Sequence, residues 1–177
     1  MAKIHPSFPL FGFTSVGAYR ERDVLQQLAD GLPDAYDIFH NVEWSEVWDG
    51  HQHFGEVDLI VVAPSGHVML VEVKSGEVEQ EDGRFFKVYG GQRKDIDQQI
   101  QRQFSNILRK LQHHHMPQVQ LHTMLVLPDH RIQGGTMAHS RTSIVDATDM
   151  PDLCRRIKEG INPQALSGED RTRVMAF

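Results

Sequence analysis

The chain has 177 residues, of which 40% are hydrophobic and 24% are charged, an ordinary balance for one globular domain with a core of normal size. The net charge of −6 at pH 7 argues against a protein that coats nucleic acid non-specifically, because such binding depends on neutralising phosphates. The single cysteine, Cys154, excludes an intrachain disulfide and a cysteine-based zinc site.

The N-terminus and the cysteine content predict a cytoplasmic location. Residues 1–13 lack the continuous apolar segment of a signal peptide, and no stretch approaches the length of a membrane span. A lone thiol in a helical-looking segment fits a reducing compartment.

The first 74 residues predict an irregular arm, a helix and three strands. Residues 1–14 carry Pro6 and Pro9 and show no period, so they predict an N-terminal arm. Ser15 precedes an apolar stripe of helical spacing over residues 17–29, which ends at Gly31 and Pro33. Alternation predicts a strand over 36–44, a loop or hairpin over 44–54, and strands over 56–63 and 67–74 with a turn at 64–66.

The rest of the chain alternates between weaker strands and helices. We expect a pair of short strands between Gly76 and residue 88, a break at Gly90-Gly91, and a long amphipathic helix over 93–112. Strands over 119–127 and 142–145, a helix over 149–161 and a polar tail over 162–177 follow. The order predicts an α/β domain with a mixed central sheet flanked by helices.

Three charged residues interrupt two otherwise apolar strands. Asp58 lies near the start of the first strand, and Glu72 and Lys74 lie near the end of the second. Charges in a central strand cost free energy unless they are paired or bind a metal. Glu72 and Lys74 share one face because side chains alternate along a strand, and the turn at 64–66 brings Asp58 beside them.

This trio suits phosphodiester hydrolysis. Asp58 and Glu72 offer hard oxygen ligands for Mg²⁺ or Mn²⁺, which would activate water and stabilise charge on the phosphate. The carbonyl of Val73 lies between the two key side chains and is expected to add a ligand. Lys74 is expected to orient the attacking water or neutralise developing charge. The alternative is a structural salt-bridge cluster at the sheet edge.

Asp58 followed by Glu72-Val73-Lys74 resembles the PD-(D/E)xK nuclease signature, and the wider pattern from Gly55 to Gly76 resembles the NERD (nuclease-related) domain. The resemblance covers roughly residues 15–161 and implies a restriction-endonuclease-like core, in αβββαβ order, that cleaves DNA with a divalent metal. Val57 replaces the Pro that precedes the Asp in the broader superfamily, and the NERD pattern also lacks that Pro.

The resemblance extends to two further positions. Glu21, on the first predicted helix, matches a family Glu that sits near the metals, while a solvated residue of the first helical turn is the alternative. Gln99 is the best match to a family Gln on the helix after the core strands, with Gln98 as the neighbouring alternative.

Two features bear on the nucleic acid. Between Arg84 and His115 seven basic residues stand against two acidic ones, which predicts a phosphate-facing surface or a solvated helix face. Trp44 and Trp48 are candidates for stacking on bases, with packing in the fold as the alternative.

The sequence therefore predicts a Mg²⁺- or Mn²⁺-dependent deoxyribonuclease domain whose partner is DNA. Related domains are fused to helicases or other modules, and the end of the chain reads equally as a linker or as the tail of a free-standing protein. A homodimer would suit double-strand cutting. The alternatives are a nucleic-acid-binding module without activity and a protein-interaction domain on the same fold.

Overall fold

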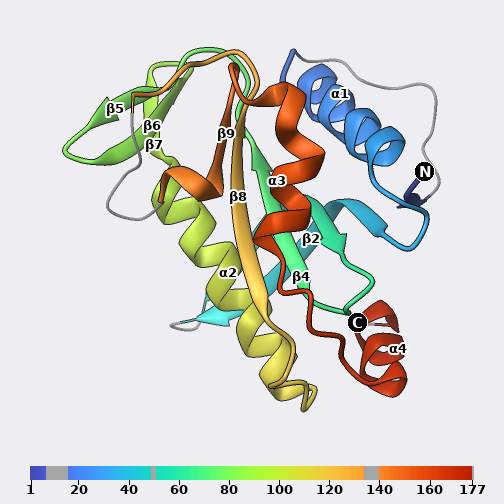
Figure 1. Cartoon of the computed structure of the whole chain (residues 1–177). Coiled ribbons are helices and arrows are strands. Elements are labelled where there is room, and N and C mark those ends of the chain that lie inside the picture. The colour runs from blue at the N-terminus through green and yellow to red at the C-terminus, as the bar shows by residue number, and fades with distance from the viewer. Residues whose placement is uncertain (7–15, 49–50, 134–139, 177) are drawn as a thin grey trace.

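A computed structural model of the chain describes residues 1–6, 16–48, 51–133 and 140–176 (Figure 1). Its central feature is a six-stranded sheet made of β1 (Lys3–His5), β2 (Asp37–Trp48), β3 (His51–Val62), β4 (Val68–Val73), β8 (Leu121–Leu127) and β9 (Ile144–Asp146). The strand order is β1-β2-β3-β4-β8-β9. β2, β3 and β4 pair antiparallel and the other neighbours pair parallel, which confirms the mixed sheet.

Helices cover both faces of this sheet (Figure 1). One face packs against α1 (Val16–Gly31) and α3 (Leu153–Gly160), with Leu28 and Ile157 fully buried against strand residues such as Val71. The other face packs against α2 (Ile96–His113), through Ile107 and Leu111. Each such fully buried aliphatic side chain contributes about 1.5–3 kcal/mol to folding. No helix within the described ranges is both long and apolar enough to cross a membrane.

A second, three-stranded sheet lies between β4 and α2 in the chain. It consists of β5 (Glu79–Glu81), β6 (Arg84–Tyr89) and β7 (Gln92–Asp95), paired antiparallel. The predicted long helix therefore begins too early, because residues 93–95 belong to β7. Gly90 and Gly91 have φ of 54° and 82°, and they form the two-residue turn that joins β6 to β7. The Asp95 side chain then caps α2 by accepting the Gln98 N–H.

Both ends of the chain are more ordered than the sequence predicts. The prediction of an irregular arm is wrong for Lys3–His5, which pair with β2, and residues 7–15 lie outside the described ranges. The polar tail forms a further helix, α4 (Gly168–Ala176), whose Val174 is buried against the α2 side of the sheet. Both segments depend on contacts with residues far away in the sequence.

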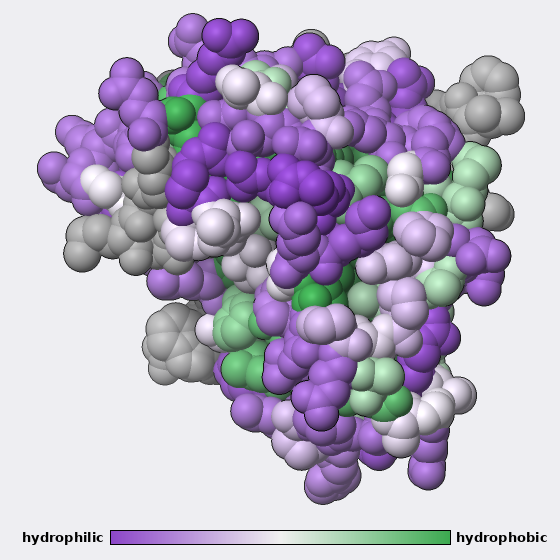
Figure 2. All heavy atoms as spheres, in the orientation of Figure 1, coloured by the Kyte–Doolittle hydropathy of each residue, from purple (hydrophilic) through white to green (hydrophobic). Residues whose placement is uncertain are grey.

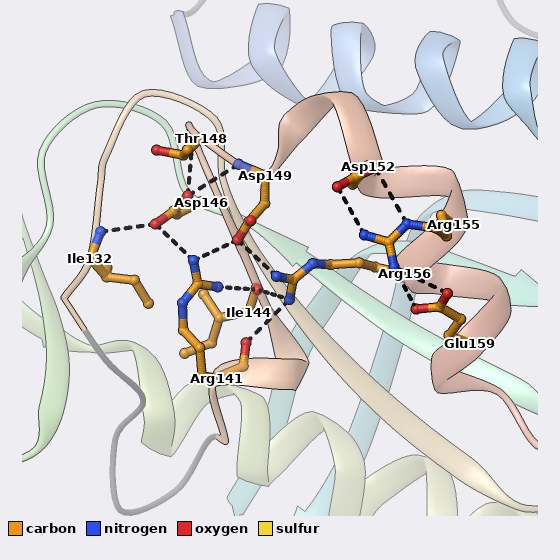
Figure 3. A network of polar contacts seen from close by, with 10 residues as sticks. All are labelled: Ile132, Arg141, Ile144, Asp146, Thr148, Asp149, Asp152, Arg155, Arg156 and Glu159. Atoms are coloured by element: carbon orange, nitrogen blue, oxygen red, sulfur yellow. Dashed lines mark hydrogen bonds and ion pairs between the residues drawn. The ribbon is translucent and has the colours of Figure 1, made fainter.

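An ion-pair network fixes α3 to the β9 edge (Figure 3). Arg141, in the short 3₁₀ helix η1 (Arg141–Ser143), forms ion pairs with both Asp146 and Asp149, and Arg156 of α3 forms one with Asp149. Asp149 itself precedes a second 3₁₀ helix, η2 (Met150–Asp152). Burial would raise the pKa of Asp146, but N–H donors including that of Ile132, together with Arg141, outweigh it and lower that pKa. This cluster is structural, since its charges are mutually satisfied.

Between α2 and α3 the sheet is only partly covered. β9 pairs with Leu125–Leu127 alone, so the earlier part of β8 forms an open edge. A hollow of about 660 Å³ lies there, lined in part by Met69, Leu121 and Met124. Figure 2 shows this face as mostly hydrophilic, with hydrophobic side chains reaching the surface near its centre.

Candidate active site

The β3–β4 hairpin brings the three predicted charges to one end of the sheet. The last paired residues of its ladder are Leu59 and Val71, so Asp58 and Glu72 stand next to each other just beyond it. The Asp58 Oδ2 accepts the Val73 N–H at 2.7 Å. The predicted meeting of Asp58 with the end of β4 is therefore present in the structure.

A local change in strand geometry aims Asp58 at β4. Val57 and Leu59 would share a face of a regular strand, yet they pack on opposite faces of the sheet. The β2–β3 ladder skips the pair between Asn41 and Asp58, and Asn41 has a φ of 51°. This irregularity turns the Asp58 carboxylate along the sheet and toward the Val73 backbone.

Glu72 and Lys74 lie together on the face that α2 covers. Both are buried, and the Lys74 Nζ donates to the Glu72 Oε1 in an ion pair. Val71 and Val73 point into the core on the opposite face. The alternation expected from sequence is confirmed, and it places the ammonium beside the carboxylate without any loop contribution.

Two glutamines of α2 complete the environment of Glu72. The Gln99 Nε2 donates to Glu72 Oε1 at 2.5 Å, whereas Gln98 is exposed, so Gln99 is the residue at the site. The Gln103 Nε2 donates to Glu72 Oε2 at 2.7 Å and to the Glu56 carbonyl at 2.7 Å. Sequence reasoning missed Gln103, although its spacing of four residues from Gln99 puts both on one helix face.

Asp58 lies in an environment that disfavours its charge. Burial raises the pKa of the Asp58 carboxyl well above its ordinary range, and the neighbouring Glu72 raises it further. Lys74 and the Val73 N–H act in the opposite direction without cancelling these effects. A positive charge placed beside such a carboxylate would stabilise its ionised form.

Glu21 reaches the same region from α1. It is half-buried, and burial raises the pKa of its carboxyl; Lys74 opposes this effect, while Glu56 and Glu72 reinforce it. These mutual effects place Glu21 within electrostatic range of the trio. Glu21 of α1 therefore feels the charges of Lys74 and Glu72.

A second lysine, which the sequence did not single out, borders the site. Burial lowers the pKa of Lys87 on β6, and Lys74 lowers it further, whereas Asp129 opposes both. Asp129 accepts the Gly76 N–H at 2.9 Å and pairs with Arg20 of α1. This arrangement connects α1 and the segment after β4 to the edge of the site.

The donor set fits a hard divalent cation. Asp58, Glu72 and the carbonyl of Val73 supply oxygen, which Mg²⁺ and Mn²⁺ prefer. A carboxylate has about four lone-pair sites, and Lys74, Gln99 and Gln103 use three of those on Glu72. In the described part of the chain no three side chains of His, Cys, Asp or Glu are grouped to hold a metal, so backbone and water oxygens would have to complete the shell.

Comparison with known proteins gives one family match. A model of the family described as nuclease-related domain (NERD) matches residues 16–128, which is more than half of the chain and includes every residue of the cluster except Asp129. Neither the curated proteins nor the solved structures yielded a significant match.

Proposed function

This chain belongs to the nuclease-related domain (NERD) family, and from that premise we propose that it hydrolyses DNA phosphodiester bonds with the help of Mg²⁺ or Mn²⁺. The observation that carries the proposal is the convergence of Asp58, Glu72 and Lys74 at the end of the β3–β4 hairpin. The PD-(D/E)xK pattern that these residues resemble brings two carboxylates and a lysine to one point.

Each residue of the site has a distinct task in the proposed reaction. Asp58 and Glu72 would hold the ion together with the Val73 carbonyl, and Glu21 would contribute a further carboxylate. A bound divalent ion supplies a water of lowered pKa and compensates charge on the phosphate. Lys74 hydrogen-bonds the attacking water and neutralises charge that develops on the phosphate oxygens. Gln99 and Gln103 fix the orientation of the Glu72 carboxylate.

Cleavage of plasmid and oligonucleotide DNA with Mn²⁺ tests the proposal. We expect the wild-type chain to cut and Lys74→Ala to lose roughly a hundred-fold or more in rate, the scale of losing one transition-state donor. Lys158→Ala, an exposed lysine on α3, is the matched control and should cut at the wild-type rate. Equal cleavage rates for Lys74→Ala and the wild-type chain would contradict the proposed mechanism.

The second candidate is a DNA-binding module of the same fold that does not cleave. The close pairing of Lys74 with Glu72, and the missing third side-chain ligand among the described residues, favour it. Calorimetry with Mn²⁺ separates the two candidates. Binding that disappears in Asp58→Asn supports the nuclease, whereas no Mn²⁺ binding in the wild-type chain supports the module. Fusion to a helicase module and pairing into a homodimer remain proposals that fit either candidate.

A further inference from the structure

A groove of about 1090 Å³ runs between the β2–β3 hairpin and one side of α2. In Figure 1 this hairpin passes behind α2, and residues of both elements line the groove. Trp44, Phe54 and Gly55 line the hairpin wall, and Gln99, Arg102 and Arg109 are among the residues that line the helix wall. We call this the α2 groove.

The α2 groove borders the candidate active site through two glutamines of α2. Gln99 and Gln103 both line it, and both donate to the Glu72 carboxylate. The Gln103 amide also holds the carbonyl of Glu56, a groove residue of the hairpin wall. A strand lying in the groove would therefore contact the glutamines that hold the buried Glu72 carboxylate.

The helix wall of the groove carries positive charge in a chain that is negative overall. Arg102 and Arg109 are exposed and seven residues apart, so they lie on one side of α2 about 10.5 Å apart along its axis. Arg93, at the end of the groove, is already compensated by Glu79 and Glu81. On α2 the positive charge of the groove therefore comes from Arg102 and Arg109.

The hairpin wall presents an aromatic ring to the groove. Phe54 is 72% exposed, which is unusual for a phenylalanine inside a strand. The half-buried Trp44 ring packs on Gly55, where a Cβ would lie 2.3 Å from the ring, so Trp44 is a fixed part of the wall. Packing is thus the observed role of Trp44, and the Trp48 side chain lies outside the described residues.

We propose that the α2 groove binds an unpaired DNA strand, with Phe54 stacked on a base and Arg102 and Arg109 against phosphates. Basic grooves with exposed aromatic rings bind single strands because every base offers a flat face for stacking. In a duplex these faces are covered by neighbouring base pairs, so Phe54 would have no partner. This inference rests on the proposed function, because it names single-stranded DNA as the preferred substrate of the proposed nuclease.

Fluorescence anisotropy of the full chain in EDTA tests this inference without cleavage. We expect labelled oligothymidine to bind more tightly than a labelled duplex of mixed sequence. Phe54→Ala should weaken single-strand binding roughly ten-fold, and Phe54→Trp should retain it. Val88→Ala, which truncates an exposed apolar side chain on β6, is the control and should leave binding unchanged.

The arginines give an independent readout. Arg102→Ala should reduce the salt dependence of binding by about one phosphate contact, while Arg131→Ala, another exposed arginine, should not. Equal affinity for duplex and single strand, or an unchanged affinity in Phe54→Ala, would overturn the inference.

The outcomes keep this inference apart from the nuclease proposal. Tight single-strand binding that depends on Phe54, combined with no cleavage in Mn²⁺, would support DNA binding in the α2 groove and contradict the nuclease proposal. Cleavage of duplex DNA at a rate that Phe54→Ala leaves unchanged would support the nuclease proposal and contradict strand binding in the groove.

Discussion

Replacing Gln103 with leucine should destabilise the chain more than any other single glutamine substitution on α2. The side chain is 2% exposed, and its Nε2 donates to the Glu72 carboxylate and to the Glu56 carbonyl, each at 2.7 Å. A hydrogen bond to a charged group contributes about 1.5–3 kcal/mol and a neutral one about 0.5–1.5 kcal/mol. Gln103→Leu removes both and leaves Glu72 with fewer donors, so we expect a loss of about 2–4 kcal/mol.

Thermal and urea unfolding of the metal-free chain measure this loss. For a chain of this length about 2–4 °C of Tm accompanies each kcal/mol, so Tm should fall by roughly 5–15 °C. Gln98→Leu changes an exposed glutamine of the same helix and should alter stability by less than about 0.5 kcal/mol. A double-mutant cycle with Glu72→Gln isolates the shared contact. If Gln103→Leu and Gln98→Leu unfold at the same temperature, the buried network is not supporting Glu72.

Three further predictions follow from the same region. Burial and the adjacent carboxylate raise the folded-state pKa of Asp58, so its ionisation opposes folding as pH rises. Asp58→Asn should therefore raise the Tm of the metal-free chain at neutral pH. This gain in Tm should vanish near pH 3, where the acid is protonated in both the folded and the unfolded state. An unchanged Tm difference across that range in scanning fluorimetry would contradict this. Gly55→Ala should cost about 1–3 kcal/mol in urea unfolding, since the added Cβ would lie 2.3 Å from the Trp44 ring; wild-type stability would show that the ring is not fixed there. Lys87→Ala should slow DNA cleavage about ten-fold by removing an ammonium beside the reacting phosphate, whereas the exposed Lys158→Ala should not, and equal rates for the two would place Lys87 outside the reaction.

The trio was accessible from sequence because its geometry is local. A short turn and the two-residue period of a strand are enough to bring Asp58 beside Glu72 and to place Lys74 on the same face. Neither step depends on how the helices pack. Glu21 and Gln99 depend on packing, and for them the resemblance to the family supplied what the residues alone left open.

The missed elements depend on long-range contacts. β1 forms only by pairing with β2 across more than thirty residues, and α4 is held by burial of Val174 rather than by a strong apolar stripe. β7 is polar on both faces, so it lacks the alternation that marks a strand. The turn formed by Gly90 and Gly91 was the local signal that could have revealed it.

Gln103 was hidden for a different reason. Sequence shows five glutamines along α2, and only the rotation of the helix about its axis decides which of them face Glu72. That rotation is set by the apolar residues Ile100 and Ile107, which lie on either side of Gln103 and are buried against the sheet. A helical projection of those two residues would have put Gln103 on the buried side.

The charges of the trio exceed what a salt bridge needs. Lys74 and Glu72 already form a pair, and Asp58 adds a second carboxylate where burial and Glu72 both disfavour its charge. Breaking a buried pair is costly, and a like charge added beside it lowers the stability of the fold, an effect that the Val73 N–H bonded to Asp58 offsets only in part. A divalent cation would reverse the sign of that effect, because two carboxylates and a backbone carbonyl are then ligands rather than competitors. The carboxylate that weakens the metal-free fold is thus the one on which metal binding should depend. Asp58→Asn should therefore both raise the Tm of the metal-free chain and abolish Mn²⁺ binding.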